Sequence, residues 1–322
     1  EGVSFSYILG QAPPRTHDTT TRRLHMVDSD ITSDPSDITS HPKYRHFRDE
    51  CDSVLLQFER AQEWADLIRQ LNLLQKTLVK YGELPLIPDK VLVAKRLYQC
   101  LNPALPPGVH EKALETLELI FSRIGTSRLS RDLAFYSEGI FPLYRHASYQ
   151  VKSKLLDLFQ RYYVPLGPRV VPCLPGLVLS LLSAMDDVGS EYYQRAIHLL
   201  DALTYCTPTH AIMSAVWGRL LHNASVRYQA LTYLKMRFPL GTPSVHEVAP
   251  SPAARGSARG SSRGSANHGR LTVSRAQFCP DATGCVIRSL VVALQQGDAL
   301  VRRTALELLV THFPLPRECR LP

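Results

Sequence analysis

The sequence predicts an all-α protein, a HEAT/armadillo-like α-solenoid of stacked antiparallel helix pairs. The first observation is a repeated segment: ASVRYQALTYLKMRFPL, from Ala224 to Leu240, is echoed by ALVRRTALELLVTHFPL, from Ala299 to Leu315. The second is the spacing of the matches, because apolar residues at i, i+4, i+5, i+8 and i+12 share one face of a helix. The third is that this stripe recurs along the chain, as expected of helical repeats.

Five copies of the stripe follow one another in chain order. The first two steps between copies are close to the ~40-residue period of helix-pair repeats, and the last step is about twice as long. A single amphipathic helix could match by chance, whereas several copies in order favour a repeat. The copies begin at Val109, Val151, Tyr192, Val226 and Val301.

The segments between the copies complete the predicted helices. Residues 44–81 carry apolar residues at helical spacing and fit two helices that cap the array, followed by a proline-bounded loop. The remaining predicted helices are 90–101, 109–125, 128–143 with 151–163, 170–184 with 190–206, 208–221 with 225–238, and 286–295 with 300–313.

Composition changes divide the chain into four parts. Residues 1–44 are rich in Thr, Ser, Asp and Pro and are expected to be disordered or atypical. Residues 45–240 form the predicted helical solenoid, residues 241–278 an Arg/Gly/Ser-rich flexible linker, and residues 279–322 a continuation of the solenoid. The chain lacks an initial Met and ends without a polar capping helix, so we expect a truncated fragment.

The 322 residues are 44% hydrophobic and 20% charged, which is typical of a soluble, core-forming protein. The most apolar run, which begins at Val170, is short and broken by Pro172 and Pro175, so it is interpreted as a buried helix. The N-terminus lacks the basic start and apolar centre of a signal peptide. Seven cysteines without a close pair favour reduced thiols in the cytosol, and no metal site is predicted at Cys279 and Cys285.

The net charge of +8 raises the question of nucleic-acid binding. Five arginines and one glutamate fall between Gly241 and Arg275, so half of the excess lies in the predicted linker. Arg/Gly segments can bind RNA, but no aromatic residue is present there to stack on a base. We therefore do not expect nucleic acid as a partner, and RNA binding through the Arg/Gly/Ser segment is kept as the alternative function.

Enzyme motifs are absent from the sequence: it has no phosphate-binding loop, zinc motif or nucleophile elbow. No catalytic, cofactor-binding or metal-binding residue is predicted, and the partner-binding residues are unknown. Trp64 and Trp217 are predicted to be core residues, with Gly218 allowing close helix approach. Two further groups are expected to be structural or solvated: His110, His146, His198, His210 and His222, and a basic rim of Arg69, Lys90, Lys95 and Arg96.

Several segments resemble the N-terminal domain of the Dopey family. They are FERAQEWADLIRQLNLLQKTL (58–78), IPDKVLVAKRLYQCLNPALPPGVHEKALETLELIF (87–121), RDLAFYSEGIFPLYRHASYQVKSKLLDLFQRYYVPLG (131–167) and AVWGRLLHNASVR (215–227). The resemblance covers roughly residues 47–240 and resumes over about 283–315. Residues 1–45 and the Arg/Gly/Ser-rich insert do not share it.

This resemblance implies a non-catalytic scaffold or adaptor in membrane traffic. It implies a large, cytosolic, peripheral membrane protein of the Golgi, the trans-Golgi network and endosomes. The resemblance implies an Arf-exchange-factor-like scaffold, an aminophospholipid flippase and kinesin light chain as partners. It also implies membrane association through those partners or through C-terminal regions beyond this chain.

Overall fold

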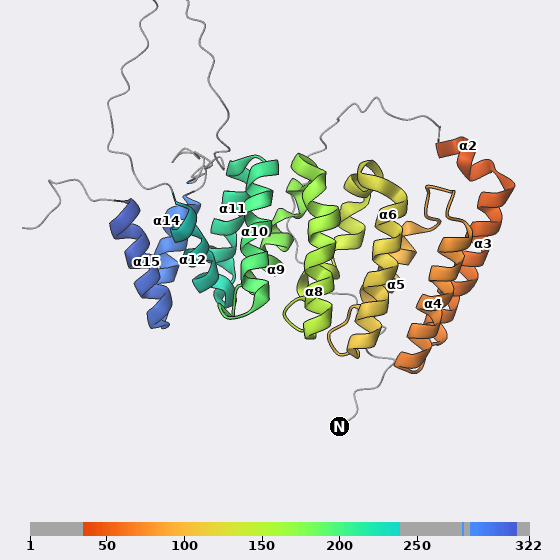
Figure 1. The fold of residues 1–322 in the computed structure, drawn as a ribbon, viewed down its shortest axis with the longest axis horizontal. Coiled ribbons are helices and arrows are strands. Elements are labelled where there is room, and N and C mark those ends of the chain that lie inside the picture. Colours follow the sequence, from red (N-terminus) through yellow and green to blue (C-terminus); the bar gives the residue numbers. More distant parts are fainter. Residues whose placement is uncertain (1–34, 239–278, 280–283, 314–322) are drawn as a thin grey trace, which may run out of the picture. The chain divides into compact units, whose positions relative to one another are not determined.

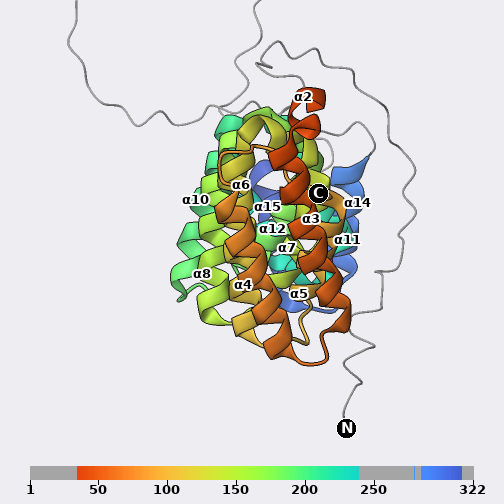
Figure 2. The same cartoon turned by 90° about the vertical axis from the view of Figure 1, so that its right-hand side faces the viewer.

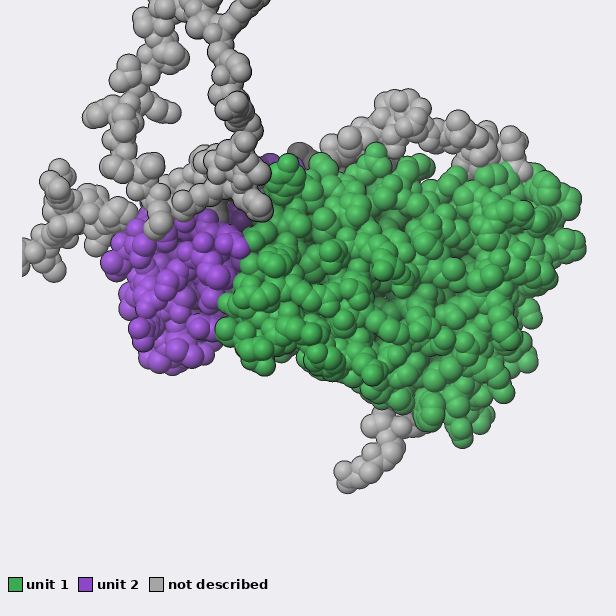
Figure 3. Space-filling model, in the orientation of Figure 1, with its two compact units in different colours: residues 1–206 green, residues 207–322 purple. Residues whose placement is uncertain are grey.

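The computed structural model of the chain describes residues 35–238, 279 and 284–313. All regular secondary structure in these residues is helical, with no β-strand (Figure 1), so the predicted all-α class is confirmed. The chain divides into two compact units, residues 1–206 and 207–322 (Figure 3). The predicted linker 241–278 and most of the predicted N-terminal segment 1–44 lie outside the described residues.

The first unit contains most of the helices. Helical structure begins at Pro35, upstream of the predicted boundary at residue 44. The helices are α2 (Pro35–Ser40), α3 (Pro42–Gln57), η1 (Phe58–Arg60), α4 (Trp64–Lys80), α5 (Lys90–Cys100), α6 (Pro107–Ser137), α7 (Ile140–Leu143), α8 (Tyr149–Leu158), η2 (Phe159–Tyr163), η3 (Val164–Cys173), α9 (Leu174–Ser183) and α10 (Glu191–Cys206).

These helices lie in two layers. Along one layer α4 contacts α6, α6 contacts α8, and α8 contacts α10 (Figures 1 and 2). The other layer contains α3, α5, α7 and α9, of which α3 contacts α5 and α7 contacts α9. The core of the unit therefore lies between two rows of helices that alternate along the sequence.

Local sequence explains where α4 begins and which face it buries. The Asp66 carboxylate accepts a hydrogen bond from the Glu63 N–H at 3.3 Å, as in a capping box. The residues Leu67, Leu71, Leu74 and Leu78, one or two turns apart, are all buried. Trp64, at the first turn, is 51% exposed, so its predicted place in the core is wrong.

The 31-residue α6 is two helices joined at Gly125. Gly125 has φ 70° and ψ 174°, a backbone geometry that a side chain would strain. The break agrees with the predicted boundary between helices 109–125 and 128–143, but the second segment ends at Ser137 and residues Ile140–Leu143 form the separate α7.

The stretch Tyr149–Ser183 is, among the described residues, the one long and apolar enough to cross a membrane by length and composition. Its backbone is not one continuous helix, because Gly167 has φ 57° and ψ −132° and is followed by Pro168 and Pro172. Half of its most apolar window is buried within the protein. We therefore interpret this stretch as core, as predicted for the run that begins at Val170.

The second unit contains α11 (Thr209–His222), η4 (Ala224–Val226), α12 (Arg227–Arg237), α14 (Cys285–Gln295) and α15 (Ala299–His312). Trp217 is fully buried, as predicted, and its carbonyl accepts a hydrogen bond from Ser289 Oγ at 3.0 Å. Gly218, however, has open space at its Cβ position, so close helix approach does not depend on it. A close approach does occur at Gly176 in the first unit, where a Cβ would lie 2.4 Å from the Phe141 ring.

The predicted stripes are buried in the first four copies, from Val109 to Phe238. The fifth copy differs. Leu306 is 52% exposed, whereas its counterpart Leu231 is fully buried. In α15 the buried face instead includes Val301, Ala305 and Leu308, because that is the side that packs against α12 and α14.

The paired arginines of the opening repeat also differ. Arg302 is exposed, whereas Arg227 is not a free surface charge. Its guanidinium donates hydrogen bonds to the Leu220 carbonyl at 3.0 Å and the Leu221 carbonyl at 3.2 Å. These carbonyls belong to the last turn of α11, where unpaired carbonyl groups favour a cation. Arg227 therefore caps the C-terminal end of α11.

Candidate protein-binding surface

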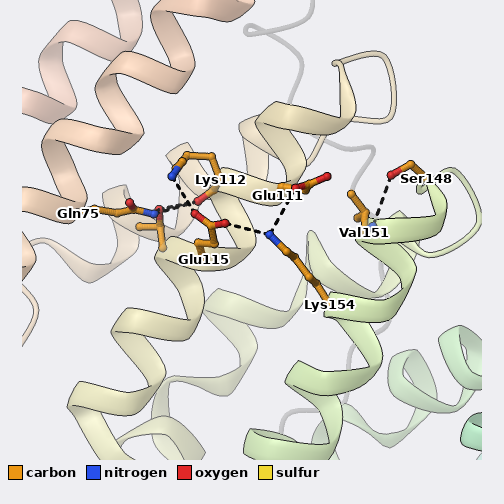
Figure 4. Close-up of polar contacts among 8 residues, drawn as sticks. Gln75, Glu111, Lys112, Glu115, Ser148, Val151 and Lys154 are labelled. Atoms are coloured by element: carbon orange, nitrogen blue, oxygen red, sulfur yellow. Dashed lines mark hydrogen bonds and ion pairs between the residues drawn. The ribbon is translucent and has the colours of Figure 1, made fainter.

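Polar side chains connect the helices of the layer formed by α4, α6, α8 and α10. Gln75 of α4 donates hydrogen bonds to Thr116 Oγ1 at 3.0 Å and to the Lys112 carbonyl of α6 at 3.4 Å. Lys154 of α8 lies 2.9 Å from a Glu115 oxygen and 3.4 Å from a Glu111 oxygen, both on α6 (Figure 4). These interactions thus join side chains of adjacent helices in the layer.

The same arrangement continues along α8 and α10. Arg161, directly after α8, forms an ion pair with Glu118 of α6. Arg195 of α10 lies 2.6 Å from an Asp157 oxygen and 3.1 Å from Ser153 Oγ, both on α8. We call the whole set the polar ladder, and it consists of Gln75, Glu111, Lys112, Glu115, Thr116, Glu118, Ser153, Lys154, Asp157, Arg161 and Arg195.

The polar ladder has a consistent direction of charge. In each ion pair between neighbouring helices, the cation comes from the later helix and the carboxylate from the earlier one. The partners are 38 to 43 residues apart in sequence. Because these side chains are substantially exposed, each pair contributes only about 0–1 kcal/mol, and a partner protein can compete for its charges.

Glu115 shows how the polar ladder affects ionisation. Partial burial raises the pKa of Glu115, but hydrogen bonds from Lys112 and Lys154 lower it by more, so the net pKa lies below its usual value of 4.5. Such a carboxyl stabilises the fold above its unfolded-state pKa, and this contribution is lost as pH falls through the folded-state pKa.

Replacing Lys154 with Met should therefore lower stability at neutral pH by up to about 1 kcal/mol, and the difference should shrink at an acidic pH below the lowered folded-state pKa of Glu115. Urea unfolding of both proteins at the two pH values measures this. Lys95→Met, at an exposed position of α5, is the control. An equal loss for Lys154→Met at both pH values would contradict the assigned ion pairs.

The hollow between α6 and α8 has little space for a small molecule. It is bordered by Leu114, Lys154 and Leu158 and has a volume of about 110 Å³. Small-molecule sites usually measure about 300–1,000 Å³. The shape of this layer is therefore better suited to a protein partner lying across several helices.

The predicted histidines do not form a site. His110 is buried and its Nε2 lies 2.8 Å from the Asn102 carbonyl, a packing role consistent with the prediction. The other four are exposed, at His146, His198, His210 and His222. Over the residues that the structure describes, no group of His, Cys, Asp and Glu is arranged to hold a metal ion.

Neither of the two buried cysteines in the core of the first unit is an activated nucleophile. Burial raises the pKa of Cys51 and of Cys100 to about 12, which keeps both thiols protonated. Cys279 and Cys285 are both partly exposed and belong to no candidate metal group among the described residues. Cys319 lies outside the described residues.

The predicted basic rim is largely neutralised. Lys90 lies 2.5 Å from an Asp132 oxygen, and Arg69 lies 2.8 Å from an Asp66 oxygen. Arg96 is buried and forms an ion pair with Glu59. The sequence pattern, which placed Arg96 on a solvated face, did not indicate this burial. Lys95 is exposed. The four cations therefore do not form an open positive patch.

Sequence reasoning did not identify the polar ladder. Its only signal was the recurrence of acidic and basic residues about one repeat apart on successive stripes. That signal becomes specific only when the stripes are known to lie side by side.

The N-terminal domain of the Dopey family matches residues 41–320, most of the length of the chain. The chain belongs to the Dopey family. It is 33% identical to protein DOP1B of Xenopus laevis over 284 residues, which are 87% of this chain and 11% of the frog protein. It is 42% identical to protein pad-1 of Caenorhabditis briggsae over 196 residues, which are 61% of this chain and 8% of the nematode protein.

A more distant relative is protein DOP1 of Saccharomyces cerevisiae, 28% identical over 309 residues that cover 88% of this chain and 18% of the yeast protein. The chain thus spans about a tenth to a fifth of the length of these relatives. No solved structure matches the chain.

Proposed function

We propose that this Dopey-family chain is a non-catalytic scaffold or adaptor segment in membrane traffic at the Golgi and endosomes. The observation that carries the proposal is the layer of α4, α6, α8 and α10, a continuous helical face joined by side-chain contacts within a Dopey N-terminal domain. Such a face offers a partner protein many contacts, and the hollow between α6 and α8 is smaller than a usual small-molecule site.

The two layers of the first unit support a HEAT/armadillo-like solenoid of stacked helix pairs. In such proteins each repeat contacts its neighbours, and equivalent residues meet one repeat apart. The separation of 38 to 43 residues between ion-pair partners in the polar ladder agrees with that period. We infer that α3 with α4, α5 with α6, and α9 with α10 are repeat units.

The proposed partners follow from the family. They are an Arf-exchange-factor-like scaffold, an aminophospholipid flippase and kinesin light chain. In this proposal the chain is cytosolic and lies on Golgi, trans-Golgi network and endosome membranes through these partners or through regions beyond residue 322. The alternative of RNA binding rests on residues 241–278, outside the described residues, and no observation in the described part favours it.

Direct binding of the purified full chain to each of the three purified partners tests the proposal. Reversing Arg161 and Arg195 together to Glu should weaken binding of at least one partner about tenfold, or by about 1.4 kcal/mol. Both cations lie on the polar ladder, and like charges placed across an interface repel. Biolayer interferometry measures the affinities, and circular dichroism verifies that the variant is folded.

Lys95→Glu is the matched control, because Lys95 is exposed on α5, in the other layer. It should leave the affinities unchanged. Failure of all three partners to bind the chain would overturn the proposed partners. Equal weakening by Lys95→Glu would overturn the assignment of binding to the polar-ladder face.

A further inference from the structure

A groove lies at the N-terminal end of the first unit, where the loop before α5, the start of α5 and the middle of α6 meet. Its volume is about 390 Å³, within the range of ligand-binding sites. Leu86, Ile87, Val91 and Ile124 give it apolar walls, and Asp89 and Arg128 supply charges. We call it the α5–α6 groove.

Two unusual backbone positions shape the α5–α6 groove. Asp89, directly before α5, has φ 43° and ψ 45°, and it is the one non-glycine residue with positive φ among the described residues. Gly125 breaks α6 directly after Ile124, so Arg128 belongs to the second helical segment. A left-handed backbone is strained in a non-glycine residue, and such residues are concentrated at binding and catalytic sites.

The charges of the α5–α6 groove are only partly paired. The ammonium group of Lys90 lies 2.5 Å from an Asp132 oxygen and 5.6 Å from the centre of the Phe135 ring, so this cation is already engaged. The Arg128 side chain, which is half-buried, forms no hydrogen bond or ion pair with any described residue, and neither does the Asp89 carboxylate. One free cation and one free anion therefore face the same groove.

The surroundings of the α5–α6 groove are apolar as well. Val91 is 57% exposed on its wall, and Phe135, which Lys90 contacts, is 43% exposed. Exposed apolar side chains beside a half-buried unpaired guanidinium are typical of a surface that binds a partner, since Arg and aromatic residues dominate binding energies.

We propose that the α5–α6 groove binds an extended peptide segment of a partner protein, which places an acidic side chain at Arg128, a basic one at Asp89 and an apolar one between them. This proposal rests on the proposed scaffold function and adds a second docking position to it. A polyanionic lipid headgroup fits less well, because Asp89 and Asp132 also line the groove. Arginine favours carboxylates through paired hydrogen bonds.

The probes are fluorescein-labelled peptides with one glutamate, one lysine and leucines between them in a Gly/Ser background. The set covers both orders of the two charges and a range of spacings, and a matched set carries glutamine at both charged positions. Fluorescence polarisation with the full chain should detect binding of at least one charged peptide, with its glutamine counterpart about tenfold weaker.

Two variants test the assigned contacts. Arg128→Gln keeps much of the side-chain stem and removes the charge, and Asp89→Asn tolerates the left-handed backbone. Each variant should lower the affinity for the bound peptide about tenfold. Arg131→Gln, at an exposed position one turn along α6 that does not line the groove, should leave binding unchanged. The double variant Asp89→Lys, Arg128→Glu should prefer a peptide of the opposite charge order.

Three outcomes would overturn the proposal. They are no charged peptide binding better than its glutamine counterpart, unchanged peptide binding by Arg128→Gln, or binding to vesicles that contain phosphatidylinositol bisphosphate without binding to any peptide. The scaffold proposal is judged separately, because its test uses whole partner proteins and the polar-ladder residues Arg161 and Arg195. Partner binding that persists without peptide binding would remove the α5–α6 groove proposal alone.

Discussion

Replacing Arg123 with alanine is expected to lower the free energy of unfolding of the first unit by about 2–4 kcal/mol. Arg123 belongs to α6, but its guanidinium lies at the C-terminal end of α4. Nε donates a hydrogen bond to the Leu84 carbonyl at 2.5 Å, and Nη1 donates one to the Leu78 carbonyl at 3.0 Å. Nη2 donates a third hydrogen bond, to the Tyr81 carbonyl.

The physical reason is that a helix ends with carbonyl groups that have no partner within it. Arg123 supplies donors to the Leu78 carbonyl in the last turn of α4 and to the Tyr81 and Leu84 carbonyls just beyond it. Its positive charge also suits the negative end of the helix dipole. The guanidinium lies 4.7 Å from the centre of the Phe47 ring, which adds a cation–π contact. Alanine would remove all of these interactions and leave the carbonyl groups without this donor.

Urea denaturation followed by circular dichroism measures the loss. The free energy of unfolding of Arg123→Lys should lie between those of the wild type and Arg123→Ala. The ammonium group of lysine is a more compact donor and cannot replace the planar fork of the guanidinium. Arg131→Ala, an exposed arginine of the same helix, should change the free energy by less than about 0.5 kcal/mol. Equal effects of Arg123→Ala and Arg131→Ala would show that the capping contacts contribute nothing.

Sequence periodicity predicted the helices well, because the burial of one helix face requires apolar residues at a regular spacing. Each helix must place an apolar stripe against a neighbour, so Val109, Val151 and Val226 were recognisable as equivalent buried positions. The break in α6 was also predictable, since Gly125 ends one stripe. These features depend on residues close together in the sequence.

Features that depend on distant residues could not be predicted in this way. Arg227 looks like an exposed helix-start residue until α11 is placed beside it, where the Leu220 and Leu221 carbonyls accept its hydrogen bonds. Trp64 shares the spacing of a buried stripe, yet its first-turn position leaves it 51% exposed. A stripe identifies one face of a helix but not where along the helix the neighbour stops.

The candidate surfaces illustrate the same limit. The polar ladder can be recognised only when the distance between α6 and α8 is known. The α5–α6 groove can be recognised only when the backbone angles of Asp89 are known. Neither is encoded in a short motif. The sequence nevertheless lacks the phosphate-binding, zinc and nucleophile-elbow motifs and resembles the Dopey family, and both features favour binding on helix faces over chemistry in an enclosed site.

The second large effect is expected at Leu231. This residue is fully buried in α12, and truncating a buried leucine to alanine usually costs about 2–5 kcal/mol, because it removes apolar contacts and leaves a cavity. Leu306 occupies the matching position of the sequence repeat but is 52% exposed in α15. Leu306→Ala should therefore cost less than about 1 kcal/mol.

Leu308 provides the matched control, because it lies in the same helix as Leu306 and is fully buried. Leu308→Ala should cost nearly as much as Leu231→Ala, so that burial and not position in the sequence repeat decides the loss. Urea denaturation followed by the fluorescence of Trp217, which is buried in the same unit, reports all three variants. A loss at Leu306 as large as that at Leu231 would mean that the outer face of α15 is covered in solution. Small, equal losses at all three would mean that the second unit gains little stability from the packing of α12 and α15.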